Sequence, residues 1–155
     1  MKRAFTYLFT LLLVYCAIGV LVMLNKIAVP NEAIKIAIYC GLIGGVGGIT
    51  YCLRGIYLNA CVFKQWDEIW LPWYFIRPLV SVICGTVSWL FLKAGLFVLE
   101  ARQTDAATNL GFYALAFVAG LNVDKFIEKI EDIAQVTWGI KKSRTAQKDG
   151  NSEQS

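Results

Sequence analysis

Histidine is absent from this chain of 155 residues. The most common general base and the most common metal ligand of proteins are therefore missing. The cysteines are scattered without a C-x-x-C pair, which argues against a zinc site and a disulfide framework; they are Cys16, Cys40, Cys52, Cys61 and Cys84. We therefore expect no catalytic residue, no metal, no cofactor and no enzymatic activity.

Acidic residues are scarce inside the apolar part of the sequence. No apolar run holds the series of carboxylates typical of a proton-coupled transporter, and no internal repeat is visible, so a small transporter is the least favoured alternative. The glycine-rich stretch at 41–48 does not match G-x-G-x-x-G and follows no predicted strand, which argues against nucleotide binding. We also expect no direct nucleic-acid binding.

Long apolar runs dominate what the sequence does contain. They are Phe5–Leu24, Ala33–Leu53, Phe75–Leu99 and about Ala106–Val123. About 20 apolar residues in a helix span the roughly 30 Å hydrocarbon core of a bilayer. Lipid offers no partner for backbone polar groups, so each run is expected to be a helix. The sequence predicts an all-α, four-helix transmembrane bundle over residues 1–139.

The first run begins after Met1-Lys2-Arg3, like a signal peptide. Its roughly 20 apolar residues exceed the 7–15 of a signal-peptide core, and no small-x-small cleavage site follows. We therefore expect a retained signal anchor.

The distribution of basic residues predicts orientation. With the N-terminus inside, the outer loops hold three basic residues, and Lys93 falls within the third run. The inner segments hold eleven: Lys2, Arg3, Arg54, Lys64, Arg77, Lys125, Lys129, Lys141, Lys142, Arg144 and Lys148. Both termini are predicted to be cytoplasmic.

Small residues form stripes on the second and third runs. The second run holds two interleaved G-x-x-x-G pairs, and the third carries a matching stripe. The members are Gly41, Gly44, Gly45 and Gly48, with Ser81, Gly85 and Ser88. Glycine lets helix backbones approach closely in lipid. We expect helix packing at these residues, within or between subunits, and a homo-oligomer.

Aromatic residues crowd the predicted inner connection, Arg54–Tyr74. The expected interface anchors are Trp66, Trp70, Trp73 and Tyr74, together with Arg77, which follows them. Such rings prefer the headgroup level, and Arg77 would reach lipid phosphates. The alternative is an aromatic surface that docks a partner or a lipid.

Basic residues near the spans have two readings. Lys35 and Arg54 are interpreted as boundary residues of the second helix. Lys93 is placed about two turns inside the third helix, where it either snorkels to the interface or serves a pore or an ion pair.

Past the fourth run the pattern becomes amphipathic. We expect the fourth helix to continue as one rod to about Trp138-Gly139, with a cytoplasmic partner covering Phe126, Ile127, Ile130 and Ile133. Spacings such as Lys125/Glu128 permit surface ion pairs. Residues 140–155 are predicted to be a disordered cytoplasmic tail.

Several segments carry a resemblance. They are Trp73-Tyr74-Phe75-Ile76-Arg77-Pro78-Leu79, Phe117-Val118-Ala119-Gly120-Leu121 and Asp124-Lys125-Phe126. In this order they resemble small four-helix membrane proteins of bacteria, some encoded in anti-phage defence loci, such as the membrane subunit of the Kiwa system. The resemblance implies a bacterial inner-membrane location and a link to antiviral defence. Together with the residues above, it predicts a self-associating sensor or anchor for a cytoplasmic protein. A pore-forming effector that depolarises the cell is the alternative.

Overall fold

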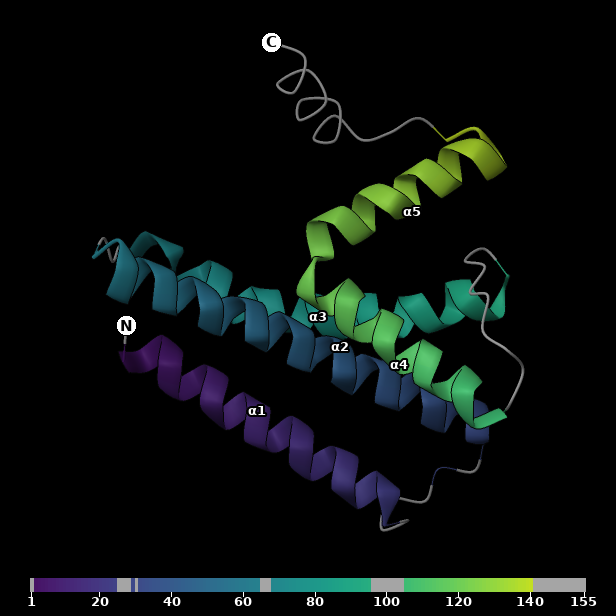
Figure 1. Ribbon diagram of the computed structural model, residues 1–155, viewed down its shortest axis with the longest axis horizontal. Helices are drawn as coiled ribbons and strands as arrows, with labels where there is room; N and C mark the ends of the chain where they lie inside the picture. The colour runs from purple at the N-terminus through teal and green to yellow at the C-terminus, as the bar shows by residue number, and fades with distance from the viewer. Residues whose placement is uncertain (1, 25–28, 30, 65–67, 96–104, 141–155) are drawn as a thin grey trace. The chain divides into compact units, whose positions relative to one another are not determined.

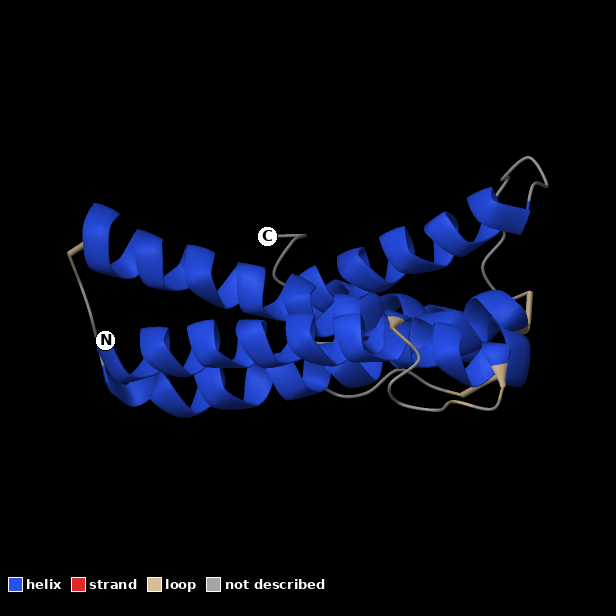
Figure 2. Ribbon diagram, turned by 90° about the horizontal axis from the view of Figure 1, so that it is seen from below, coloured by secondary structure: helices blue, strands red, loops and turns tan. Residues whose placement is uncertain are grey.

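The computed structural model describes residues 2–24, 29, 31–64, 68–95 and 105–140. These residues form helices and no strand, which confirms the all-α prediction (Figure 2). The helices are α1 (Lys2–Met23), α2 (Glu32–Tyr57), a π-helix η1 (Leu58–Val62), a 3-10 helix η2 (Glu68–Trp70), α3 (Leu71–Lys93), α4 (Asp105–Leu121) and α5 (Val123–Trp138).

The chain divides into two compact units, Met1–Val123 and Asp124–Ser155. The first unit contains α1 to α4, and the second contains α5 from Asp124 onward.

Three helices are long and apolar enough to cross a membrane: α1, α2 continued by η1, and α3. The number rises to four if α4 and α5, which are bent at a break between them, count as one span. The 31 residues of α2 and η1 extend for about 46 Å, well beyond the roughly 30 Å of hydrocarbon. The protein is therefore built as a multi-pass membrane protein.

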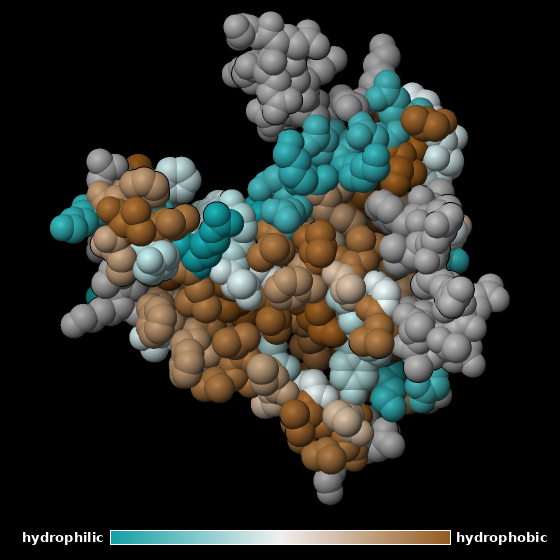
Figure 3. Space-filling view, viewed as in Figure 1, coloured by the Kyte–Doolittle hydropathy of each residue, from teal (hydrophilic) through white to brown (hydrophobic). Residues whose placement is uncertain are grey.

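The centre of the first unit is α2, which packs against α1, α3 and α4 (Figure 1). The face of this unit that Figure 3 shows is largely apolar, as its brown surface indicates. Leu13 of α1 and Ile83 of α3 are among the exposed apolar side chains. An apolar exterior over an interior rich in small residues suits a lipid environment.

The limits of α3 differ from those expected. It begins at Leu71, with Pro72 in its first turn, so Pro78 lies inside the helix and does not open it. It ends at Lys93, because Ala94 caps it and Gly95 adopts a left-handed backbone with φ of 72°. The predicted residues 96–99 lie outside the described residues.

The second helix continues past its predicted end at Leu53. Arg54 therefore lies in the last turn of α2, which ends at Tyr57. The inner connection is correspondingly shorter than predicted, because α2 and η1 reach Val62 and α3 starts at Leu71.

The predicted continuous rod after the fourth run is wrong. Asn122 is a turn between α4 and α5, and asparagine favours turns because its side chain can bond to nearby backbone. The far end agrees with the prediction, since α5 ends at Trp138 and Gly139 has a left-handed φ of 68°. The predicted tail, apart from Ile140, lies outside the described residues.

Candidate functional site

Backbones of three helices meet at the glycines of α2. A Cβ on Gly44 would lie 2.7 Å from both the Gly85 Cα and the Ser81 carbonyl oxygen of α3. A Cβ on Gly47 would lie 2.9 Å from the Leu121 backbone nitrogen of α4. Any side chain at these positions would push the helices apart, so glycine is required for this packing.

All seven predicted packing residues are buried: Gly41, Gly44, Gly45, Gly48, Ser81, Gly85 and Ser88. Their contacts lie within one chain, since Gly41 and Gly48 face α3 and Gly45 faces Tyr15 of α1. The sequence reasoning missed Gly47 and Gly120, both of which lie at the contact between α2 and α4. The small-x-x-x-small spacing of Ala116 and Gly120 was the signal that could have identified the α4 surface.

Ser81 links α3 to the end of α4. Its hydroxyl oxygen lies 2.9 Å from the Arg77 carbonyl oxygen and 2.9 Å from the Gly120 carbonyl oxygen. The single hydroxyl proton can be donated to either carbonyl, so one bond is intrahelical and the other joins two helices. This contact positions the last turn of α4 beside α3.

Beyond the end of α4, large side chains replace glycine. We call this region the aromatic end and define it by Tyr51, Asn59, Trp73, Tyr74 and Arg77. The Asn59 side-chain amide donates to the Tyr74 hydroxyl at 3.4 Å. The Trp73 ring centre lies 5.8 Å from that of Tyr51 and 5.2 Å from that of Tyr74.

Arg77 lies inside this cluster with only 6% of its surface exposed. Its guanidinium carbon is 4.9 Å from the centre of the Tyr51 ring and 5.4 Å from that of Trp73. The negative faces of aromatic rings attract a cation, and the attraction strengthens when water is excluded. An ionisable side chain among membrane helices is a functional candidate by default. The aromatic end is therefore the candidate site of the first unit.

The predicted interface anchors separate into two groups. Trp70 is exposed and Trp73 is half-buried, whereas Trp66 lies outside the described residues. Tyr74 and Arg77 are buried, so the expectation that they face the membrane interface is wrong. The reason is the extra length of α2 and η1, which brings Asn59 against the first turns of α3.

Lys93 is the last residue of α3 and is exposed. The placement two turns inside a span is therefore wrong, and the pore and ion-pair roles lose their basis. A cation in the last turn is favoured by the partial negative charge at a helix C-terminus. Lys35, at the start of α2, pairs with Glu32 at 3.8 Å.

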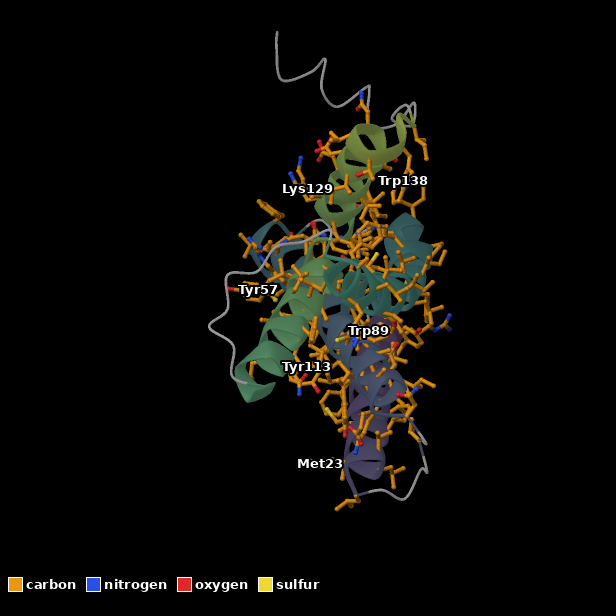
Figure 4. The ribbon with its side chains drawn as sticks, turned by 90° about the vertical axis from the view of Figure 1, so that its right-hand side faces the viewer. Met23, Tyr57, Trp89, Tyr113, Lys129 and Trp138 are labelled. Carbon is orange, nitrogen blue, oxygen red and sulfur yellow. The ribbon has the colours of Figure 1, made fainter. Side chains whose placement is uncertain are left out.

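The second unit carries the predicted partner-binding residues on α5. Phe126 is buried, Ile130 and Ile133 are half-buried, and Ile127 is 42% exposed. The expected ion pair between Lys125 and Glu128 is present at 3.1 Å. Lys129 and Trp138 project from opposite sides of the helix (Figure 4).

No group of three or more histidine, cysteine, aspartate or glutamate side chains gathers in the part of the chain that the structure describes. Comparison of the chain with protein-family models, with curated proteins and with solved structures found no match.

Proposed function

We propose that this protein is a non-enzymatic anchor or sensor in the bacterial inner membrane that recruits a cytoplasmic protein through α5. The observation that carries the proposal is the composition of α5, which is too polar to be a span by itself and forms part of a separate compact unit. An amphipathic helix outside the lipid needs a protein or a membrane surface against its apolar side.

The exposed apolar edge of α5 defines the proposed docking surface. Ile127 and Trp138 are exposed and Ala134 is half-buried, and helical spacing places all three on one side. Four acidic residues and two lysines give α5 a net negative charge; they are Asp124, Glu128, Glu131, Asp132, Lys125 and Lys129. A partner with an apolar groove and a basic rim would complement both features.

The orientation rests on the basic residues. With Lys93 at the outer end of α3, the outer side holds four basic residues and the inner side still holds eleven. If α4 crosses as the fourth span, α1 begins and α5 emerges on the same side. The 17 residues of α4 extend for about 25 Å, close to the thickness of the hydrocarbon core.

Self-association and a role in anti-phage defence stay predictions. The glycine stripes do not support self-association, because they are buried within one chain. A conducting path through a single chain is disfavoured for the same reason, since the backbones of α2, α3 and α4 meet at its centre. The anchor is thus preferred to the pore.

The test compares two variants that add the same charge to different sides of α5. Ile127→Asp places a carboxylate on the docking surface, and Gln135→Asp places one on the polar side. Burying one apolar side chain contributes roughly 1.5–3 kcal/mol, so Ile127→Asp should weaken docking at least about tenfold. Affinity purification in mild detergent with mass spectrometry should show a cytoplasmic protein retained by Gln135→Asp and lost with Ile127→Asp. The proposal fails if both variants retain the same proteins.

A further inference from the structure

The face of α2 that α4 covers continues beyond the end of α4. The last turn of α4 lies against Gly47. Residues three, four and seven positions after Gly47 share its side of the helix. They are Thr50, Tyr51 and Arg54. From Gly47, α2 and η1 continue for another 15 residues, or about 22 Å.

This uncovered stretch is polar and exposed. Thr50 and Arg54 are exposed, and Tyr57, one turn further, is 60% exposed. Figure 4 shows Tyr57 projecting away from the helices. The Thr50 hydroxyl bonds to the Val46 carbonyl at 2.8 Å, which leaves its oxygen able to accept a further bond.

The Arg54 side chain has neither an ion pair nor a hydrogen bond within the described residues. It differs in this from Arg77, whose guanidinium stacks on the Tyr51 ring. Arg54 is thus exposed, whereas Arg77 is buried. Only Arg54 is available to a ligand outside the protein.

The height of Arg54 along α2 indicates what the ligand is. Arg54 follows Glu32 by 22 residues, or about 33 Å, which is close to the thickness of the hydrocarbon core. If Glu32 marks one boundary, Arg54 lies at the phosphate level of the other. Helix surface that no protein covers at this height contacts lipid.

We propose that Arg54, Thr50 and Tyr57 bind the headgroup of an anionic phospholipid in the space beyond the end of α4. The planar guanidinium donates two parallel hydrogen bonds to the phosphate, and the Tyr57 hydroxyl donates to a headgroup oxygen. The Thr50 oxygen accepts a hydrogen bond from a headgroup hydroxyl such as those of phosphatidylglycerol. The phenol ring is suited to the boundary between headgroups and chains. The lipid site does not depend on α5 or on a partner of α5. Either proposal can therefore be disproved without affecting the other.

Native mass spectrometry of the full chain in mild detergent, titrated with phosphatidylglycerol or phosphatidylcholine, tests the proposal. Arg54→Gln should weaken phosphatidylglycerol binding about tenfold, which corresponds to about 1.4 kcal/mol for one charge-assisted contact. The matched control is Arg3→Gln, which removes another exposed cation, on α1. Arg3→Gln should change binding less than about twofold, within the scatter of surface charges.

Two further measurements keep the result decisive. Arg54→Lys keeps the charge but loses the planar guanidinium. Its affinity for phosphatidylglycerol should therefore lie between that of Arg54→Gln and that of the unchanged protein. Excess inorganic phosphate should not displace the lipid, because the ligand is also held by its chains. Equal weakening in Arg54→Gln and Arg3→Gln, no weakening in either, or displacement by inorganic phosphate would overturn the proposal. Thermal unfolding of each variant in the same detergent confirms that the fold is retained.

Discussion

The two halves of α2 are packed in opposite ways. At Gly44 and Gly47 its backbone touches the backbones of α3 and α4, and the neighbouring glycines leave room for side chains of α1 and α3. From Tyr51 to Asn59 of η1, rings, an amide and a buried guanidinium make contacts beside the buried apolar Cys52 and Ile56. The first half depends on shape, and the second depends on electrostatic attraction in a region of low dielectric constant.

The difference teaches where the molecule should tolerate change. A glycine contact has no intermediate state, because an added carbon either fits or separates the helices. A cluster of large side chains can reorient around a loss. The glycine half should therefore be sensitive to size, and the aromatic end should be sensitive to charge and planarity.

The largest expected effect concerns which side of the membrane each half faces. Reporter fusions after Lys64, at the aromatic end, should report the cytoplasm, and fusions near Glu32, at the other end of α2, should report the outside. The result is all-or-none, because a span either crosses or does not. A fusion after Trp138 should agree with Lys64, and an outward signal there would remove the four-span topology.

Gly44→Ala should show the next largest effect. The new Cβ would lie 2.7 Å from the Gly85 Cα, and that backbone cannot move without separating α2 from α3. We expect a loss of about 3 kcal/mol in unfolding free energy, at the upper end of the range for overpacking. The matched control is Gly19→Ala, whose Cβ would lie 3.9 Å from the Leu42 Cδ1 atom, an ordinary contact. Denaturant titration in mild detergent measures both, and equal stabilities would contradict the shape argument.

Arg77→Lys tests the aromatic end. The charge is retained, but the flat stack on Tyr51 and Trp73 is lost, so we expect destabilisation of about 1–2 kcal/mol. A double-mutant cycle with Tyr51→Leu should give a coupling of about 1 kcal/mol. Additive effects in that cycle would show that the ring and the cation do not interact.

The smallest effect is expected at Lys93, outside both halves. Lys93→Leu removes an exposed charge from the last turn of α3, so the loss should stay below about 1 kcal/mol. Membrane potential in cells should not change either. Altered ion leakage with Lys93→Leu would favour the alternative function, a pore, over the anchor.

Much of the helical content followed from the sequence, because apolar length and glycine spacing are local signals. The small-residue stripes predicted which sides of α2 and α3 are buried. They did not reveal whether the contact lies within or between chains, since both arrangements place the same residues in contact. The break at Asn122 was missed because the apolar periodicity continues through it.

The aromatic end was the main error of sequence reasoning. Trp73, Tyr74 and Arg77 have the composition of an interfacial belt, and composition cannot tell a ring in contact with lipid from one in contact with a cation. The decisive information was the length of α2, which continues past Arg54 and through Gly55 to Tyr57. Burial of Arg77 then depends on which segments meet, and that is a property of the tertiary structure.

The π-helical turn η1 determines how the chain can change in length. Its Phe63 N–H donates to the Leu58 carbonyl five residues earlier, at 2.9 Å, so this turn holds one residue more than an α-helical turn. Removing one residue from Leu58–Val62 would restore an ordinary turn and leave everything before Leu58 in register. Phe63 would then still donate to the Leu58 carbonyl, which would lie four residues earlier, so Phe63 and Lys64 would keep their direction. The chain can therefore lose a residue here while the connection to α3, the glycine contacts of α2 and the stack of Arg77 on Tyr51 all stay in register.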